Sequence, residues 1–377
     1  MILFLHHRYR TTGGEERAVD DLLWLVRTQL GEDAELVERD SSGMGRGAAA
    51  SGLLRGGLDP HDVAHAVRRT NARIVHAHNL QPTFGWRALA AARAAGARVV
   101  LHLHQYRLVC AIGVCFRDGR ECTRCHGRNT LPGIMLNCRG SRSEAAAYGL
   151  SLMAWQRRLI AHVDAFVVPS RFAEARLRAL GVPLGPVATQ GGAATFVIPN
   201  LVREFASAPP PHPGDHALVV SRLAPEKGIE VAMRACAMAG VPLVVAGDGP
   251  ERERLAARAN GSTRFIGHVS AEELATLRAG ARVAVVPSLS AETFGLAAAE
   301  AMAAGVPVAA SRIGALPELV PDAWLAPPGD PQALAEVIRR LGPGDAAAAL
   351  ERAREVTAPE RVAPALAAVY EHAVTRR

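Results

Sequence analysis

Residues 287–305 read PSLSAETFGLAAAEAMAAG and decide how the second half of the chain folds. The apolar run Val283–Pro287 comes before this stretch, and small apolar residues follow Gly295 until Gly305. This pattern predicts a strand, a loop and a helix that starts near Gly295. Glu292 precedes that helix and Glu300 lies in its second turn. Because free backbone amides at a helix start attract anions, the stretch predicts a site for a phosphate beside two carboxylates.

The same strand and helix pattern recurs on both sides of this stretch. Runs of four to seven β-branched or apolar residues alternate with Ala-, Leu- and Arg-rich helical segments, which indicates βαβ units and parallel sheets. A proline-rich stretch, residues 206–214, has no periodicity and reads as a linker between two α/β halves. Ligands of doubly wound sheets bind outside the carboxyl ends of the strands, so we expect a cleft between two such domains. The expected strands are Ile2–His6, Glu35–Arg39, Arg73–Ala77, Arg98–His104, Ala165–Pro169, Thr195–Pro199, Ala217–Ser221, Pro242–Ala246, Thr263–Ile266, Val283–Pro287 and Val306–Ala310.

Composition fits a folded protein of two or more domains. The chain has 377 residues, of which 49% are hydrophobic and 5% aromatic. No apolar run approaches the roughly 18–20 residues that span a bilayer, and the start lacks a signal-peptide pattern, so we expect a soluble, cytoplasmic protein.

The first 200 residues carry 25 arginines against 16 acidic residues. This basic half suggests an anionic partner or membrane surface, or simply a solvated arginine-rich surface.

Two further turns of the second half carry residues that suit a phosphate. Ser221–Gly228 places Arg222 at a strand end and Lys227 at the following helix start, and Lys227 is the only lysine in the chain. Arginine and lysine are the usual cationic ligands of phosphate. The turn Gly247-Asp248-Gly249 adds glycines that let a backbone approach a ligand, although such a turn is weak evidence alone.

At this point the sequence resembles a known family. Glu292 and Glu300, within ETFGLxxxEAMAxGxPV, look like the Glu-x7-Glu signature of family-four retaining glycosyltransferases, which have the GT-B fold of two facing Rossmann-like domains. Four more motifs match in the same order, and the resemblance covers essentially the whole chain. They are SRLxPEKG at 221–228, AGDGP at 246–250, FxGxV at 265–269 and GALPE at 314–318.

The resemblance implies a role for each matching residue. Arg222 and Lys227 would hold the donor diphosphate in place of a metal, and Glu300 would bind the ribose. Glu292 and the backbone of Phe294, Gly295 and Leu296 would meet the sugar and phosphate, and Gly267 and Val269 would lie near the base. It also implies domains 1–203 and 204–357, and a C-terminal helix, 358–377, that packs back on the first domain.

The first half carries a glycine pair and four histidines at expected strand ends. Gly13 and Gly14 open a helix after the first strand and permit close approach of a phosphate or sugar; in the resembling family they face the cleft. His76, His78, His102 and His104 form two pairs, each on one strand face, and could also make a metal site. By resemblance, His104 faces the donor sugar. Gln105 stands where the family subgroup has Asn, which affects the expected sugar preference and not the reaction.

Five cysteines lie in the arginine-rich segment 105–143. A C-x-x-C pair with two further cysteines fits tetrahedral zinc, and we expect a structural ion that staples this long loop. Free thiols and a redox pair are the alternatives. The resembling subgroup shares four of the five, Cys110, Cys122, Cys125 and Cys138, and Cys115 is extra.

The leading prediction is a retaining glycosyltransferase that moves a sugar from a UDP- or GDP-sugar to a hydroxyl of a glycan, lipid-linked or small-molecule acceptor. We expect metal-independent catalysis, no nucleic-acid partner, and a place in bacterial polysaccharide or glycoconjugate biosynthesis. One alternative is a basic nucleic-acid-binding protein with a zinc module, although aromatic residues for base stacking are scarce. A second alternative is a sugar-nucleotide epimerase of the same build.

Overall fold

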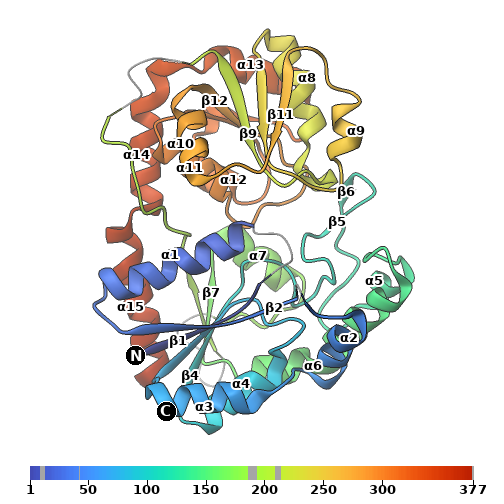
Figure 1. Ribbon diagram of the computed structural model, residues 1–377, viewed down its shortest axis with the longest axis vertical. Coiled ribbons are helices and arrows are strands. Elements are labelled where there is room, and N and C mark those ends of the chain that lie inside the picture. The colour runs from blue at the N-terminus through green and yellow to red at the C-terminus, as the bar shows by residue number, and fades with distance from the viewer. Residues whose placement is uncertain (9–12, 42, 186–192, 209–213, 376–377) are drawn as a thin grey trace. The chain divides into compact units, whose positions relative to one another are not determined.

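The computed structural model describes residues 1–8, 13–41, 43–185, 193–208 and 214–375. The chain forms two compact units. Unit 1 comprises Met1–Cys115, Cys122–Pro199 and Pro359–Arg377, and unit 2 comprises Phe116–Glu121 and Asn200–Ala358. Each unit is a parallel sheet flanked by helices (Figure 1).

Unit 1 is built on a six-stranded sheet in the order β2-β1-β3-β4-β7-β8, and every pair is parallel. The sequence order reverses between β1 and β3, so the switch point of this sheet lies at their carboxyl ends. The inner strands are buried on both faces, which explains why their sequences lack polar alternation. The strands are β1 (Ile2–Arg8), β2 (Ala34–Asp40), β3 (Ile74–Ala77), β4 (Arg98–His102), β7 (Ala165–Val168) and β8 (Ala194–Val197).

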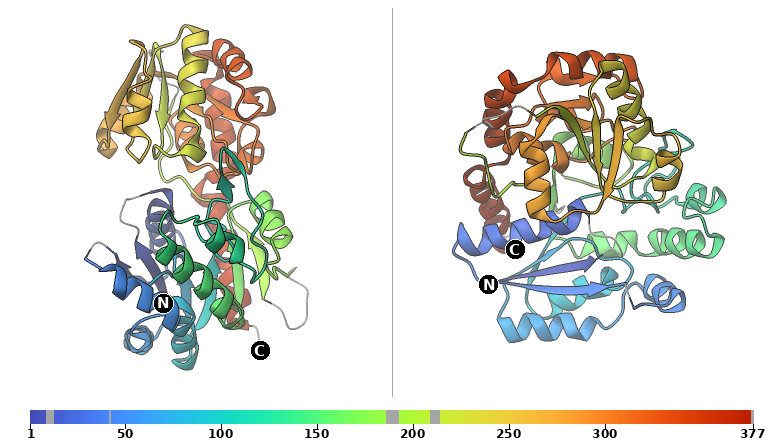
Figure 2. Two further views of the ribbon diagram at one scale, coloured as in Figure 1. Left: turned by 90° about the vertical axis from the view of Figure 1, so that its right-hand side faces the viewer. Right: turned by 45° about the horizontal axis from the view of Figure 1, so that its top comes forward.

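Helices connect these strands and cover the sheet. Helix α15 (Pro359–Thr375) contacts β3, β4 and β7 (Figures 1 and 2, dark red), and the hydroxyl of Tyr370 lies 2.9 Å from Nδ1 of His76. A stretch of about 160 residues therefore separates α15 from the rest of its own unit. The remaining helices of unit 1 are α1 (Gly14–Thr28), α2 (Arg46–Arg55), α3 (Pro60–Thr70), α4 (Gly85–Ala94), α5 (Leu131–Met135), α6 (Arg142–Ala161) and α7 (Arg171–Ala179).

Unit 2 has a six-stranded parallel sheet in the order β11-β10-β9-β12-β13-β14. Here the order reverses between β9 and β12, and crevices of such sheets open at that point. The strands are β9 (His216–Val220), β10 (Leu243–Ala246), β11 (Thr263–Gly267), β12 (Ala281–Val286), β13 (Val308–Ser311) and β14 (Leu325–Ala326). The helices are α8 (Ile229–Ala239), α9 (Arg252–Ala256), α10 (Ala271–Ala279), α11 (Leu296–Ala303), α12 (Leu316–Leu319), α13 (Pro331–Arg340) and α14 (Ala346–Thr357), with short 3₁₀ turns at Pro225–Lys227, Asp322–Trp324 and Pro343–Asp345.

The structure differs from the expected organisation at three places. The chain leaves unit 1 at Pro199, and Ala206, at the start of the proline-rich stretch, is already hydrogen bonded to Ala303 and Arg354 of unit 2. Residues 209–213 of that stretch lie outside the described residues. A two-stranded hairpin, β5 (Phe116–Arg117) with β6 (Arg120–Glu121), belongs to unit 2 although the cysteine-rich segment around it belongs to unit 1. The proline that follows the Gly247-Asp248-Gly249 turn could occupy the first turn of the next helix, but helix α9 begins at Arg252, so Pro250 precedes it.

Candidate donor site in unit 2

Two loops of unit 2 start side by side at the switch point. Because β9 and β12 are adjacent and parallel, the loop after β9 and the loop after β12 leave the same edge of the sheet. The amide of Leu289 donates to the carbonyl of Glu226 at 2.8 Å, which ties the two loops together. Gly228 has a φ of +65°, and a Cβ atom there would lie 2.1 Å from the carbonyl oxygen of Pro287. Glycine is therefore required where the loops cross.

Lys227 and Glu292 meet across these loops. Nζ of Lys227 donates to Oε1 of Glu292 at 2.7 Å, and Oγ of the buried Ser288 donates to the same oxygen at 2.6 Å. Burial favours the neutral form of Glu292, but the ammonium of Lys227 and these two hydrogen bonds outweigh it and lower the pKa of Glu292 below its usual value. The sequence placed both residues in the site, and the structure shows that they form one charged pair.

A third loop fixes the backbone of Glu292. The amide of Ala315 donates to the carbonyl of Glu292 at 2.9 Å. A Cβ atom on Gly314, whose φ is +62°, would lie 2.4 Å from the backbone nitrogen of Glu292. The GALPE motif at residues 314–318 thus packs against the backbone of Glu292 and fixes the position of the loop that carries it.

Arg222 lies on the first of these loops and is half-exposed. Its guanidinium forms an ion pair with Glu226, four residues on, whose carboxylate is buried. Both cations of the site, Arg222 and Lys227, are therefore held by a carboxylate in this structure. These ion pairs keep the two positive side chains ordered before any anion arrives. A bound diphosphate would compete with the two carboxylates for the same cations.

Helix α11 begins next to this pair of cations. Gly295 is the N-cap residue of α11 and has a φ of +101°. The side chain of Phe294 is buried in the core, so only its backbone is available to a ligand. Glu300 follows in the second turn, where its carboxylate pairs with Arg278 of α10. The two cations lie on the loop after β9, and the start of α11 and Glu300 follow the neighbouring loop after β12, so this sheet edge can bind an anionic ligand with hydroxyl groups.

Gly267 and Val269 mark the end of β11. The amide of Gly247 donates to the carbonyl of Gly267 at 2.7 Å, which joins the AGDGP turn to this strand end. Val269 lies two residues after the end of β11 and is half-buried. The region expected to lie near the base is thus connected to the loop after β10, within the same unit.

In unit 1, His104 lies just beyond β4 and is buried. Its Nε2 is 2.9 Å from Nδ1 of His78, and its ring stacks on His102 at a centroid distance of 4.0 Å. Burial lowers the pKa of His104 to about 3, so the imidazole is neutral at physiological pH. A neutral ring of this kind can donate or accept one hydrogen bond without bringing charge.

Gly14 is the first residue of α1, and the residues around it meet the loop after β4. The amide of Gly13 donates to Oε2 of Glu16 at 2.8 Å, and Nε2 of Gln105 donates to Oε2 of Glu15 at 2.8 Å. The start of α1 is therefore held against Gln105, next to His104. Residues 9–12, which precede this glycine pair, lie outside the described residues.

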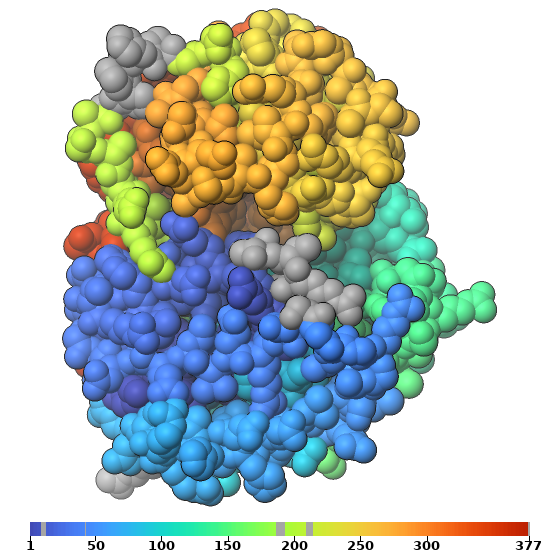
Figure 3. Space-filling view, viewed as in Figure 1, coloured from blue at the N-terminus to red at the C-terminus, as the bar shows by residue number. Residues whose placement is uncertain are grey.

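The cysteine-rich segment reaches the surface of unit 1 (teal to green in Figure 3). All cysteines are free, and the thiols of Cys110 and Cys115 are hydrogen bonded to each other. Among the described residues, the cysteines do not form a group of three that could hold a metal ion. The four expected ligands, Cys110, Cys122, Cys125 and Cys138, are thus not brought to ligand spacing here, and structural zinc stays a prediction.

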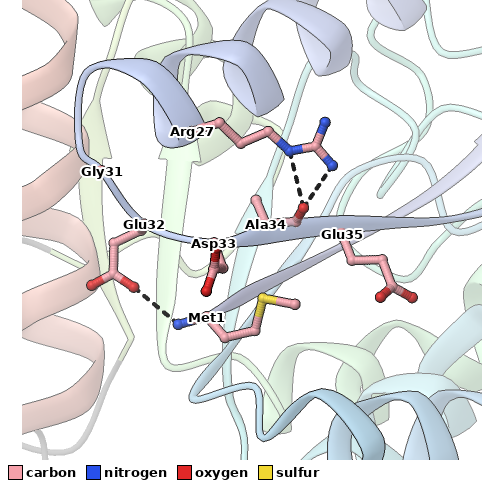
Figure 4. A pocket seen from close by; sticks show the side chains of 7 residues that line it. All are labelled: Met1, Arg27, Gly31, Glu32, Asp33, Ala34 and Glu35. Carbon is pink, nitrogen blue, oxygen red and sulfur yellow. Dashed lines mark hydrogen bonds and ion pairs between the residues drawn. The ribbon is translucent and has the colours of Figure 1, made fainter.

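A surface pocket of about 380 Å³ lies at the other end of the first sheet (Figure 4). Met1 and Ala34 line it at the amino ends of β1 and β2, where Arg27 donates two hydrogen bonds to the Ala34 carbonyl. Because ligands of doubly wound sheets bind at the carboxyl ends, this pocket is not part of the candidate site.

Three residues of the site escaped sequence reasoning: Glu226, Ser288 and Arg278. Glu226 stands four residues after Arg222, a spacing that favours an ion pair on a helical turn, so a signal existed for it. Ser288 and Arg278 carry no such signal, because their partners become neighbours only when the sheet forms.

Two family models match the chain. One, described as "Glycosyl transferase 4-like domain", matches residues 3–190, and the other, described as "Glycosyl transferases group 1", matches residues 214–342. Among curated proteins, the chain is 46% identical over 122 residues to an MMP alpha-(1->4)-mannosyltransferase of Mycolicibacterium hassiacum, which is 29% of this chain and 28% of that protein. It is 37% identical over 163 residues to a glycogen synthase of Mycobacterium tuberculosis, which is 40% of this chain and 39% of that protein. The chain thus matches well under half the length of these relatives.

Solved structures resemble the whole chain. Sucrose-phosphate synthase from Thermosynechococcus elongatus aligns with a TM-score of 0.66 at 20% identity, over 98% of both chains. HepE of Anabaena, solved in complex with UDP, aligns with a TM-score of 0.61 at 18% identity, over 98% of this chain and 99% of that chain. At such identities the likeness shows the fold. None of the helices among the described residues combines the length and apolar character needed to cross a membrane.

The family models do not favour the nucleic-acid-binding or epimerase alternatives. With one model over each unit and GT-B neighbours over its full length, the chain belongs to the group 1 glycosyltransferases and has the GT-B fold.

Proposed function

We propose that this protein transfers a glycosyl group, with retention of configuration, from a UDP- or GDP-sugar to a hydroxyl of a glycan, lipid-linked or small-molecule acceptor. The observation that carries the proposal is the charged arrangement at the switch point of unit 2. There Lys227 and Arg222 lie on the loop after β9, and α11 begins after the neighbouring loop that follows β12, which supports a diphosphate site at this sheet edge. Stabilising the departing charge is the main electrostatic task of such a reaction.

The residues have three tasks in this mechanism: they hold the diphosphate, the nucleoside and the donor sugar. Arg222 and Lys227 hold the diphosphate and carry out the task that a divalent metal has in other transferases. Glu300 binds the ribose, Gly267 and Val269 lie near the base, and Gly14 lies near the phosphate or sugar. Glu292, His104 and the backbone of Phe294 to Leu296 meet the donor sugar. The acceptor hydroxyl attacks from the side of the leaving group, and the departing phosphate takes its proton.

Relatives and neighbours support the donor class without identifying it. HepE was solved with UDP and with UDP-glucose, and other curated relatives are described as mannosyltransferases that depend on GDP-mannose. We infer that the basic first half, with its arginine-rich cysteine segment, contacts an anionic acceptor or membrane surface.

A donor screen tests the proposal. Thermal shifts of the full chain would be measured with UDP-, GDP-, ADP- and dTDP-sugars, and NMR of the product would report the anomeric configuration. A stabilising UDP- or GDP-sugar and a product with the configuration of the donor would support the proposal. Stabilisation by none of these donors, or an inverted product, would refute it.

A further inference from the structure

Six aromatic side chains share one face of the first sheet, the face on which α1 and α15 pack. The ring of Phe4, on β1, stacks on His78 at a centroid distance of 5.5 Å, and His102 stacks on His76 at 5.5 Å. Within this group His76, His78 and His102 stand out, because each offers one ligand nitrogen and these three atoms lie within 4.8 Å of one another. The remaining members are His6 and His104.

The hydrogen bonds of these three imidazoles leave some of their nitrogens unsatisfied. Nδ1 of His76 is bonded to the hydroxyl of Tyr370, and Nδ1 of His78 is bonded to His104, both at 2.9 Å. Nε2 of His76, Nε2 of His78 and both nitrogens of His102 are buried without a hydrogen-bond partner. The three residues are between 0 and 4% exposed. Buried polar atoms of this kind need a partner, and four in one cluster are unusual.

The cluster has the features of a metal site. Neutral imidazole is the form that binds metal, and the three rings are buried with their ligand nitrogens close together. In metal sites the second nitrogen of each histidine ligand is usually held by a hydrogen bond, which fixes the ring and its tautomer. Tyr370 and His104 supply such bonds to His76 and His78, so that Nε2 of each of these two rings is left for an ion, and His102 offers either of its nitrogens.

We propose that His76, His78 and His102 bind a transition-metal ion of the zinc or cobalt type, with Tyr370 and His104 as their outer hydrogen-bond partners. Three nitrogen ligands suit these ions, and bonds of about 2.0–2.1 Å would draw the three nitrogens together. The carboxylate of Glu16, 3.8 Å from Nε2 of His6, contributes a negative charge on the same face. The ion would satisfy three buried nitrogens and lock this face of the sheet to α15.

Binding would also fix the proton positions next to His104. With an ion on Nε2 of His78, the proton of that ring must be on Nδ1, which then donates to Nε2 of His104. His104 in turn carries its own proton on Nδ1. The relevance of these proton positions to sugar transfer rests on the proposed function, whereas the metal site itself does not.

The test is the metal content of the full chain, produced without a polyhistidine tag in medium supplemented with Zn²⁺ or Co²⁺. The ion must be present during expression because the imidazoles are buried. We expect about one equivalent held by nitrogen ligands, lost in His102→Ala and kept in His65→Ala, whose histidine is exposed on α3. The proposal would be overturned if His102→Ala kept its full metal content, or if all the metal of the wild-type protein were held by the cysteine segment.

X-ray absorption of the zinc-loaded wild-type protein gives an answer that does not depend on any variant folding. A first shell that contains imidazole nitrogens supports the site, either alone or beside a separate sulfur shell at two equivalents of zinc. A shell of sulfur alone, or a protein that takes up no zinc, contradicts it. The donor screen depends on Arg222 and Lys227 of unit 2 and not on the histidines. The result for the metal site therefore leaves the proposed transferase function to be tested separately.

Discussion

The ammonium of Lys227 lies 2.7 Å from Oε1 of Glu292, and Ser288 donates to that same oxygen. The chain's one lysine thus rests on the first acidic residue of the Glu-x7-Glu motif. A donor diphosphate would take over part of the bonding of this lysine, while Glu292 keeps its bond to Ser288 and remains available to the sugar.

Removing either cation should disable catalysis. Lys227→Ala and Arg222→Ala should each lower kcat/KM by roughly a hundredfold or more, since each removes about 2.7–4 kcal/mol of charge stabilisation in the transition state. Steady-state kinetics with the identified donor measures this loss. Arg258→Ala is the matched control, because Arg258 pairs with Glu230 on the surface of the same unit. Near-normal kcat/KM in Lys227→Ala would remove the basis for the phosphate assignment.

The two residues proposed to meet the sugar should separate chemistry from nucleotide binding. Glu292→Gln and His104→Ala should abolish transfer while leaving the affinity for UDP or GDP within a few fold, because neither is assigned to the phosphates. Calorimetric titration with UDP and GDP, beside turnover assays, tests both halves of this statement. A variant that lost nucleotide binding but kept turnover would show that its residue contacts the nucleotide and not the sugar.

Arg278 should act on the nucleotide through Glu300. The Arg278→Ala variant frees the Glu300 carboxylate from its ion pair and should weaken UDP or GDP binding several-fold, since a partly buried pair of this kind contributes on the order of 1 kcal/mol. The Kd of the nucleotide is the measurement, with kcat expected to change little. Arg278→Lys should recover part of the affinity, and equal defects in the two variants would argue against a role for charge.

The cysteine segment gives a separate metal prediction. If Cys110, Cys122, Cys125 and Cys138 bind zinc, this segment holds about one equivalent with Zn–S bonds near 2.3 Å, separate from any ion at the histidines, and the segment must close around it. Chelation should then loosen the segment and weaken acceptor use, while donor binding by unit 2 survives. Protein with full activity and four reactive thiols at these positions would contradict the prediction.

His7 should make unit 1 sensitive to acid. Burial, with the neighbouring His6, Arg107 and Arg39, lowers its pKa from 6.5 to about 4 despite Asp40, and its ring is bonded to Thr83 and Ser41. The unfolded chain therefore takes up a proton first, so the contribution to stability is complete above about pH 6.5 and is lost as the pH falls toward 4. The slope should reach at most about 1.4 kcal/mol per pH unit for this group.

Urea unfolding between pH 7.5 and 4.5, followed by tryptophan fluorescence, measures that slope. Three of the four tryptophans, Trp24, Trp86 and Trp155, belong to unit 1. The buried His76, His78, His102 and His104 also have lowered pKa values and contribute to the same slope, so His7→Gln should reduce the slope by at most about 1.4 kcal/mol per pH unit, and the exposed His65→Gln should leave it unchanged. An unaltered slope in His7→Gln would show that the pH dependence has another source.

The sequence was sufficient for the parts of the site that local pattern determines. The loop with Arg222 and Lys227, and the loop with Glu292 ahead of α11, follow from strand ends, glycines and helix signals. The ion pairs of Glu226 and Arg278 were missed because they depend on which loops and helices become neighbours.

The return of α15 to the first sheet has a consequence for the order in which the chain is made. Ribosomes release the N-terminus first, so residues 1–199 emerge while Tyr370 and its helix are still untranslated. Unit 2, continuous from Asn200 to Ala358 apart from one hairpin, is complete before unit 1 can close. The part of the histidine face that α15 covers therefore stays open to the surrounding solution until that helix has left the ribosome.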